Sequence, residues 1–179
     1  WRPISLLNVD YKIAAKAIAE RVKSVLPHIV NNDQVGYVQG RNITDNIRSI
    51  LDIMEYLDCD DAPGILINVD FEKAFDSVSW EFLEEVLMEK FRFDLPFIRW
   101  IRTVYNDVES CVCNNGFTSK YFKLGRGVRQ GDPLSPYLFI LVAEILSSKI
   151  RQDQNIQGIC IEEKESKLFQ YADDMNGLV

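Results

Sequence analysis

Three aspartates end apolar segments that lie far apart along the chain. Asp70 comes directly after the apolar run of residues 64–69, which predicts a short buried strand. Asp173 and Asp174 end a second apolar segment, at about residues 167–172. A carboxylate at the end of a buried strand is costly unless it is paired or bound to a metal, although a single aspartate can also cap a turn. Together the three carboxylates form an oxygen-only set, which suits Mg²⁺ or Mn²⁺ better than Zn²⁺.

A glycine-rich segment with two arginines lies between these aspartates. It runs from Gly125 to Pro136, and Pro133 is predicted to open a helix that reaches about Arg151. Glycines let a backbone approach a ligand closely, while arginines and helix N-termini attract phosphate. Alone, such a segment is often only a loop with a capped helix. Beside a carboxylate pair it indicates phosphoryl transfer, since two bound cations can clamp the attacking and leaving oxygens.

The elements that must position these motifs alternate between helices and strands. Apolar spacing predicts helices at about 11–26 (stopped by Pro27), from the N-cap Thr44 to Leu57, from Ser79 to Phe91, and after the cap Asp94. A hairpin is predicted around Asn114-Asn115-Gly116, followed by strands at about 159–162 and 167–172. This order predicts an α+β domain with an open sheet, compatible with a ferredoxin-like split βαβ arrangement.

Composition fits one globular domain. The chain has 179 residues, of which 47% are hydrophobic and 26% charged, and no stretch approaches the roughly 18 apolar residues of a membrane span. The net charge of −7 hides two basic blocks, residues 1–48 and 93–151, that alternate with acidic ones. Four cysteines without CxxC spacing favour reduced thiols in an intracellular protein. The start at Trp1 and the abrupt end lead us to interpret the chain as a fragment.

In combination, these motifs resemble the palm motifs of a reverse transcriptase of the non-LTR retrotransposon (long interspersed element) type. Asp70 with Ala74-Phe75-Asp76 resembles the first palm motif, Arg129 to Pro136 the second, and Tyr171 to Asp174 the third. Residues 2–13 and 34–46 resemble that family's fingers motifs. The resemblance implies a right-hand polymerase architecture without its thumb, with fingers over residues 1–63 and a truncated palm with a ferredoxin-like sheet over 64–179.

The resemblance also implies roles for single residues. Asp70, Asp173 and Asp174 would be catalytic and would hold two metal ions, helped by the carbonyl of Phe71. Phe75 would be the steric gate that excludes a 2′-hydroxyl. The remaining assignments are Arg2, Gln130 and Gly131 to the incoming nucleotide, Arg41 to the template, and Tyr171 and Ala172 to the primer end.

The implied activity is RNA-directed DNA synthesis, in which two Mg²⁺ (or Mn²⁺) ions assist nucleotide transfer from a dNTP to a primer 3′-hydroxyl. The implied partners are an RNA template, a DNA primer, dNTPs and other domains of a parent polyprotein, a thumb and an endonuclease among them. No membrane is involved, and the parent protein is expected in the nucleus and cytoplasm. Lacking a thumb, the isolated segment is expected to be inactive.

Two alternatives stay open. One is a decayed, inactive remnant that binds RNA. The other is a polymerase of group II intron maturase-like or telomerase-like type, although the opening Arg2 to Leu7 and the Gln39-Gly40-Arg41 segment favour the retrotransposon type. After Asp174, the sequence Asn176-Gly177 favours a turn where the family continues with a strand.

Overall fold

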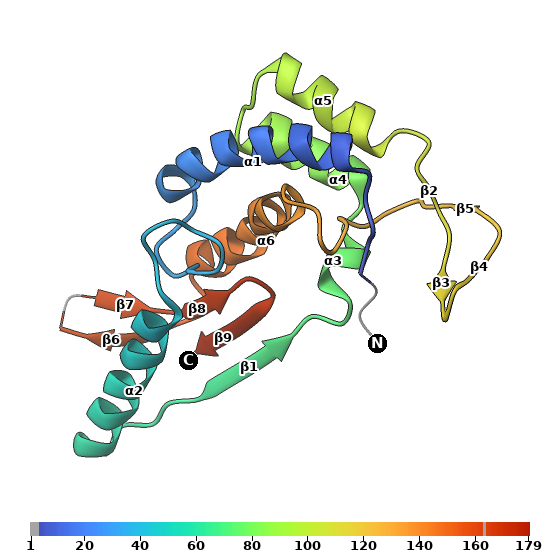
Figure 1. Ribbon diagram of the computed structural model, residues 1–179. Helices are drawn as coiled ribbons and strands as arrows, with labels where there is room; N and C mark the ends of the chain where they lie inside the picture. Colours follow the sequence, from blue (N-terminus) through green and yellow to red (C-terminus); the bar gives the residue numbers. More distant parts are fainter. Residues whose placement is uncertain (1–3, 163) are drawn as a thin grey trace.

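The computed structural model describes residues 4–162 and 164–179 (Figure 1). The helices are α1 (Val9–Ile29), α2 (Ile43–Cys59), α3 (Ala74–Ser77), α4 (Trp80–Glu85), the π-helical turn η1 (Val86–Lys90), α5 (Leu95–Tyr105) and α6 (Ser135–Gln152). The strands are β1 (Leu66–Asp70), β2 (Glu109–Ser110), β3 (Cys113–Asn114), β4 (Phe117–Thr118), β5 (Phe122–Lys123), β6 (Ile159–Ile161), β7 (Lys164–Ser166), β8 (Leu168–Tyr171) and β9 (Asp174–Leu178). No helix in these described parts is long and apolar enough to cross a membrane.

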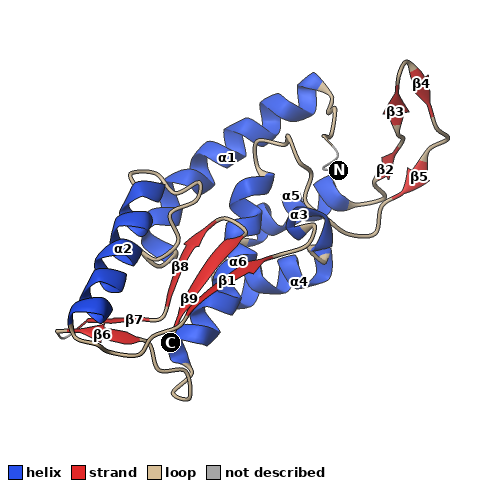
Figure 2. Ribbon diagram, turned by 90° about the horizontal axis from the view of Figure 1, so that it is seen from below, coloured by secondary structure: helices blue, strands red, loops and turns tan. Residues whose placement is uncertain are grey.

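An antiparallel sheet of three strands, in the order β1-β9-β8, forms the centre of the fold (Figure 2). The central strand, β9, pairs with β1 on one side and with β8 on the other. The Asn176-Gly177 pair therefore lies inside a strand, and the turn predicted there is wrong. Both residues have partners on two sides, and this tertiary pairing overrides the local preference of Asn-Gly.

Helices cover the two faces of β8 and β9 differently. On one face Ser147 of α6 bonds to Gln170 of β8, and α6 is packed in turn against α1, α4, η1 and α5 in the main apolar core. On the other face Ile53 of α2 joins Phe169 and Leu178 in a smaller apolar cluster. The alternation of side chains along β8 thus sends Gln170 and Phe169 to opposite layers.

Strand β1 is exposed along its whole length, so the prediction of a buried strand is wrong. Leu66, Ile67 and Val69 are all exposed. Within the described residues β1 is paired along one edge only, and the main core lies behind β8 and β9. A run of apolar residues predicts a strand that can be buried, but whether it is buried depends on which other elements cover it.

The predicted hairpin is confirmed. Asn115 and Gly116 both have positive φ, 49° and 80°, as a two-residue type I′ turn requires. The two short ladders β3–β4 and β2–β5 form an arm that projects from the body in both views (Figures 1 and 2).

Several predicted element ends shift. Pro27 lies inside α1, which continues to Ile29, and α2 is capped by Asn42, whose side chain accepts from the Thr44 N–H. The predicted third helix begins after Ser79 as expected but finishes in the π-helical turn η1. Strand β7 was not predicted.

Candidate functional site

The sheet brings the three aspartates to one of its ends. Asp70, the last residue of β1, lies directly opposite Asp174, the first residue of β9, and Asp174 also pairs with Tyr171 of β8. Directly opposed residues of antiparallel strands point to the same face. Between Tyr171 and Asp174 the chain reverses through Ala172 and Asp173. Residues about a hundred positions apart are thereby neighbours across two strands.

A cavity of about 450 Å³ adjoins this end of the sheet. It is lined by residues of all three palm-like motifs: Asp70, Phe71, Glu72, Lys73, Ala74, Phe75 and Asp76 of the first, Arg129, Gln130, Gly131 and Pro136 of the second, and Asp173 of the third, with Tyr37 in addition. Of the residues singled out from the sequence, the cavity gathers Asp70, Phe71, Phe75, Gln130, Gly131 and Asp173. Tyr171, Ala172 and Asp174 belong to the adjoining strands and their turn.

Backbone hydrogen bonds dock the glycine-rich segment onto the first motif. The Val128 N–H donates to the Phe75 carbonyl (2.8 Å) and the Gly127 N–H to the Val78 carbonyl (2.7 Å). Gly127 has φ +95°, and a Cβ there would lie 3.0 Å from the Asp76 carbonyl oxygen. The close approach and the positive φ together explain why a glycine is needed at this position.

Asp132 holds the end of the same segment. It is 2% exposed, and its carboxylate accepts from the hydroxyls of Tyr11 (3.0 Å) and Ser135 (2.8 Å) and from the Leu134 N–H (3.2 Å). Burial and the neighbouring Asp132 raise the pKa of Tyr11, which therefore stays a neutral donor. Asp132 is thus an anchor that fixes Gln130 and Gly131 at the start of α6.

Arg129 lies between two aromatic rings. Its guanidinium carbon is 5.3 Å from the ring centre of Tyr11 and 5.2 Å from that of Tyr105. Its Nη2 donates to the Val104 carbonyl (2.9 Å). Burial raises the pKa of Tyr105 to about 12. Cation–π contacts of this kind orient the arginine at the cavity wall.

The Phe75 ring is stacked on Phe139 of α6. The ring centres are 4.7 Å apart with an interplanar angle of 11°. Phe75 lines the cavity, whereas Phe139 is buried in the main core. The stack therefore fixes the plane of a bulky ring at the cavity wall.

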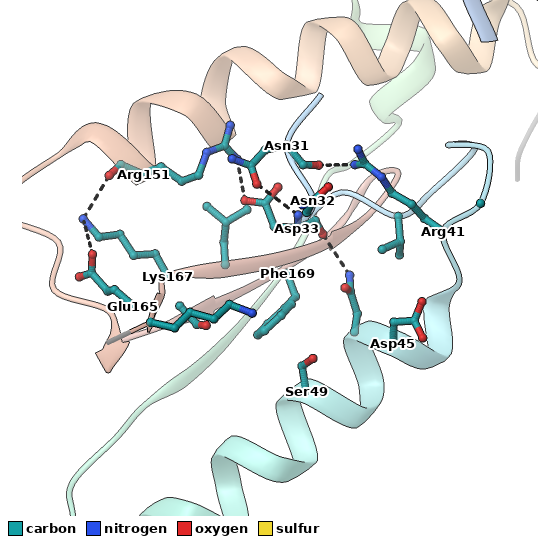
Figure 3. A pocket seen from close by; sticks show the side chains of 16 residues that line it. Asn31, Asn32, Asp33, Arg41, Asp45, Ser49, Arg151, Glu165, Lys167 and Phe169 are labelled. Carbon is teal, nitrogen blue, oxygen red and sulfur yellow. Dashed lines mark hydrogen bonds and ion pairs between the residues drawn. The ribbon is translucent and has the colours of Figure 1, made fainter. Parts of the chain in front are cut away.

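Arg41 lies away from this cavity and faces the chain's own backbone (Figure 3). Its guanidinium donates to four carbonyl oxygens at the end of α1 and in the following loop: those of Pro27, Val30, Asn31 and Gln34. This explains how α1 extends past Pro27, because the carbonyls of its last turn find a charged donor. The contact of Arg41 with a template stays a prediction, and Arg2 lies outside the described residues.

A largely buried ion cluster lies in the same region, and Figure 3 shows its Arg151–Asp33 pair. Arg151 of α6 pairs with Asp33 (2.6 Å) and with Glu144. Burial raises the pKa of both carboxyls, and Arg151 opposes the shift. The cluster ties the loop after α1 to the last turns of α6.

The carboxylates at the cavity suit a hard divalent cation. Asp70 and Asp173 present oxygen donors to the same cavity, the Phe71 residue adjoins them, and Asp174 lies opposite Asp70. Oxygen-only donors are the preferred ligands of Mg²⁺ and Mn²⁺. Within residues 4–162 and 164–179, no three His, Cys, Asp or Glu side chains form a ready-made metal site.

Several residues that line this cavity were not among the site residues predicted from the sequence, Lys73 and Tyr37 among them. Lys73 has no role among the predicted site residues, yet it lines the cavity in the left-handed conformation (φ 51°). Tyr37 also has positive φ (57°), and burial, then Tyr171 and Asp173, raise the pKa of its hydroxyl. Lys73 lies inside the first palm-like motif and Tyr37 inside the segment 34–46 that resembles a fingers motif, and these positions are the sequence signals for the two residues.

The sequence is similar to a known protein family and to several known proteins. The sequence profile described as "Reverse transcriptase (RNA-dependent DNA polymerase)" matches residues 1–178. The "Transposon TX1 uncharacterized 149 kDa protein" of Xenopus laevis is 37% identical over 177 residues, which is 98% of this chain and 13% of that protein. The "Retrovirus-related Pol polyprotein from type-2 retrotransposable element R2DM" of Drosophila melanogaster is 29% identical over 82% of this chain and 14% of its own length. The chain thus spans about one seventh of these relatives.

Solved structures of telomerases resemble the chain in fold. An apo telomerase from Candida tropicalis superposes with a TM-score of 0.61 at 13% identity, over 94% of this chain and 31% of that one. A telomerase from Candida albicans with the TWJ fragment of telomeric RNA gives 0.61 at 14% identity, over 93% and 30%. The predicted fold class, α+β with the right-hand polymerase architecture of fingers and palm, is confirmed.

Proposed function

Because the chain belongs to the reverse transcriptase (RNA-dependent DNA polymerase) family, we propose that it supplies the fingers and palm of an RNA-directed DNA polymerase from a non-LTR retrotransposon. We assign residues 1–63 to the fingers and 64–179 to the palm. The observation that carries the proposal is the pairing of Asp70 with Asp174, together with the cavity that Asp70 shares with Asp173. The 37% identity to a transposon protein favours this type over a telomerase, for which the likeness is one of fold.

The aspartates are the residues that would hold the cations. Asp70, Asp173 and Asp174 offer carboxylate oxygens and Phe71 its carbonyl. Two Mg²⁺ ions bound there would lower the pKa of a primer 3′-hydroxyl and neutralise charge on the departing pyrophosphate. The chain itself contributes opposite charge and position, which supply most of the catalysis of phosphoryl transfer.

The other cavity residues would select and orient the nucleotide. Phe75, fixed by its stack on Phe139, would leave no room for a 2′-hydroxyl under the sugar. Gln130 and Gly131 would line the base and sugar, on a segment anchored by Asp132. Arg2 would meet the triphosphate, Arg41 the template strand, and Tyr171 with Ala172 the primer end. An RNA template would be read by base pairing, with the protein contacting its backbone and 2′-hydroxyls.

Primer extension on an RNA template tests the activity, with the protein expressed from its complete reading frame and Mg²⁺ present. Asp173→Asn should abolish synthesis, because it removes a carboxylate from the cavity. Asp107→Asn is the matched control, since Asp107 is an exposed carboxylate at the base of the hairpin arm, paired with Lys123. Undiminished synthesis by Asp173→Asn would show that the metal assignment is wrong. Absence of synthesis by the unaltered protein would favour the inactive remnant.

Ribonucleotide incorporation tests the steric gate. Phe75→Ala should admit ribonucleotides, because it removes the ring at the cavity wall. Phe97→Ala is the control: Phe97 forms a stacked pair with Phe93 (ring centres 4.6 Å apart) and is not among the residues that line the cavity, so the change should cost stability without relaxing sugar selection. Equal incorporation by both variants would assign Phe75 to packing alone.

A further inference from the structure

Two buried glutamines lie beneath the turn that carries Asp173. Gln34, in the loop after α1, and Gln170, on β8, are each 1% exposed. The loop runs beside β8 as a short parallel bridge, in which the Val35 N–H donates to the Gln170 carbonyl (2.9 Å) and the Gln170 N–H to the Asp33 carbonyl (2.8 Å). This docking brings a side chain from the N-terminal part of the chain under the turn between β8 and β9.

Both amides bind the backbone of Ala172. The Gln34 Oε1 accepts from the Ala172 N–H (2.9 Å) and from the Gly36 N–H (2.8 Å). The Ala172 carbonyl accepts from the Gln34 Nε2 (3.3 Å) and from the Gln170 Nε2 (3.0 Å). The side chains of Gln34 and Gln170 thus provide hydrogen-bond partners for both the N–H and the carbonyl of Ala172.

Ala172 needs such support because of its conformation. It has φ +54°, in the left-handed region, and it is 3% exposed. That conformation is unfavourable for a residue with a Cβ and persists only where its surroundings hold it. Without an acceptor the buried N–H would add a further penalty. The conformation of Ala172 sets the direction in which the chain presents the next residue, Asp173.

Two further features hold the glutamines themselves. The Ser147 hydroxyl of α6 donates to the Gln170 Oε1 (2.7 Å), which leaves the Gln170 Nε2 directed at Ala172. Gly36 lies against the turn, since a Cβ there would be 2.4 Å from the Ala172 nitrogen. Only a residue without a side chain lets the loop come close enough for Gln34 to reach.

We propose that Gln34 and Gln170 are positioning residues, an amide clamp that holds Ala172 in its left-handed conformation and so directs Asp173 toward the cavity it shares with Asp70. The inference rests on the proposed function, because it assumes that Asp173 holds a divalent cation. It adds a contribution from the N-terminal loop to the geometry of the palm-like site.

The test compares Gln34→Leu with Asn46→Leu. Asn46 is a matched control because it is a buried amide beside the same loop: its Nδ2 donates to the Asp33 and Gln170 carbonyls, both at 3.1 Å, and it does not contact Ala172. Three quantities are measured on the protein from its complete reading frame: hydrogen–deuterium exchange of the peptide containing Ala172, Mn²⁺ binding by calorimetry, and unfolding in urea. The Mn²⁺ affinity of the site is taken as the part that Asp173→Asn removes.

Gln34→Leu removes all three hydrogen bonds of the Gln34 side chain and should speed exchange around Ala172. Mn²⁺ binding at the site should weaken by about tenfold, which is the equilibrium effect of one ordinary hydrogen bond, because only part of the lost energy is transmitted to Asp173. Asn46→Leu should cost comparable stability but leave the Mn²⁺ affinity within about twofold, since its partners lie outside the turn.

Unchanged Mn²⁺ affinity in Gln34→Leu, or an equal loss in Asn46→Leu, would overturn the clamp as a positioning device. Failure of the proposed function gives a different result from failure of the clamp: if Asp173→Asn leaves Mn²⁺ binding unchanged, the assignment of the metal site is wrong. In that case the exchange measurement alone decides whether the amides hold the turn, and unaltered exchange in Gln34→Leu would overturn that as well.

Discussion

Replacing Asp132 by alanine should lower the free energy of unfolding by about 4 kcal/mol. Its buried carboxylate accepts three hydrogen bonds, from Tyr11, Ser135 and the Leu134 N–H. Each bond to a charged group is worth roughly 1.5–3 kcal/mol, and the sum is reduced because the donors share one partner and are not additive. For a chain of this size the loss corresponds to a fall in Tm of about 8–16 °C.

Urea titration followed by far-ultraviolet circular dichroism measures this change, with the unfolding free energy obtained by linear extrapolation. Asp132→Asn should cost about half as much, since one amide oxygen can keep the bonds from the Tyr11 and Ser135 hydroxyls. Asp107→Ala, at an exposed ion pair, should leave the unfolding curve unchanged. A loss below about 1 kcal/mol in Asp132→Ala would refute the view that Asp132 anchors the segment.

Three further predictions concern the loop after α1. Arg151→Met should lower the unfolding free energy by about 3–5 kcal/mol at pH 7 in urea titrations, because it strands two buried carboxylates. Burial raises the pKa of Glu144 and Asp33, so the folded state keeps their protons to higher pH than the unfolded state does. The free energy of unfolding should therefore fall as the pH rises from about 4. Glu144→Gln should make this fall smaller, as measured by urea titrations at a series of pH values. Gly36→Ala should cost about 1–3 kcal/mol by overpacking against Ala172 and should weaken Mn²⁺ binding in calorimetry.

Local patterns were enough to predict the order of most elements, with α3 and β7 among the exceptions. Turn chemistry at Asn115-Gly116 and a proline near the start of α6 are encoded within a few residues, so both elements could be found from sequence, although α6 begins at Ser135 and not at Pro133. The motif resemblance brought Asp70 and Asp173 together, and the β1–β9 register places Asp70 beside the pair.

What the sequence did not predict depends on partners distant along the chain. Gln34 and Arg41 act through side-chain bonds to backbone atoms, and such bonds leave no periodic signal. The strand through Asn176-Gly177 forms because both neighbouring strands supply ladder partners. The exposure of β1 could not be foreseen, since alternation and hydropathy say nothing of which edge of a sheet a strand occupies.

The bare edge of β1 has a practical consequence for work with this polypeptide. Among the described residues, no strand pairs with the outer edge of β1, so its backbone N–H and C=O groups beside the exposed Leu66 and Ile67 offer a template for intermolecular strand addition. Concentrated samples of the 179-residue chain should self-associate through this strand edge. Ile67→Lys should keep such samples monodisperse, because a charge on an edge strand disfavours pairing with a second molecule.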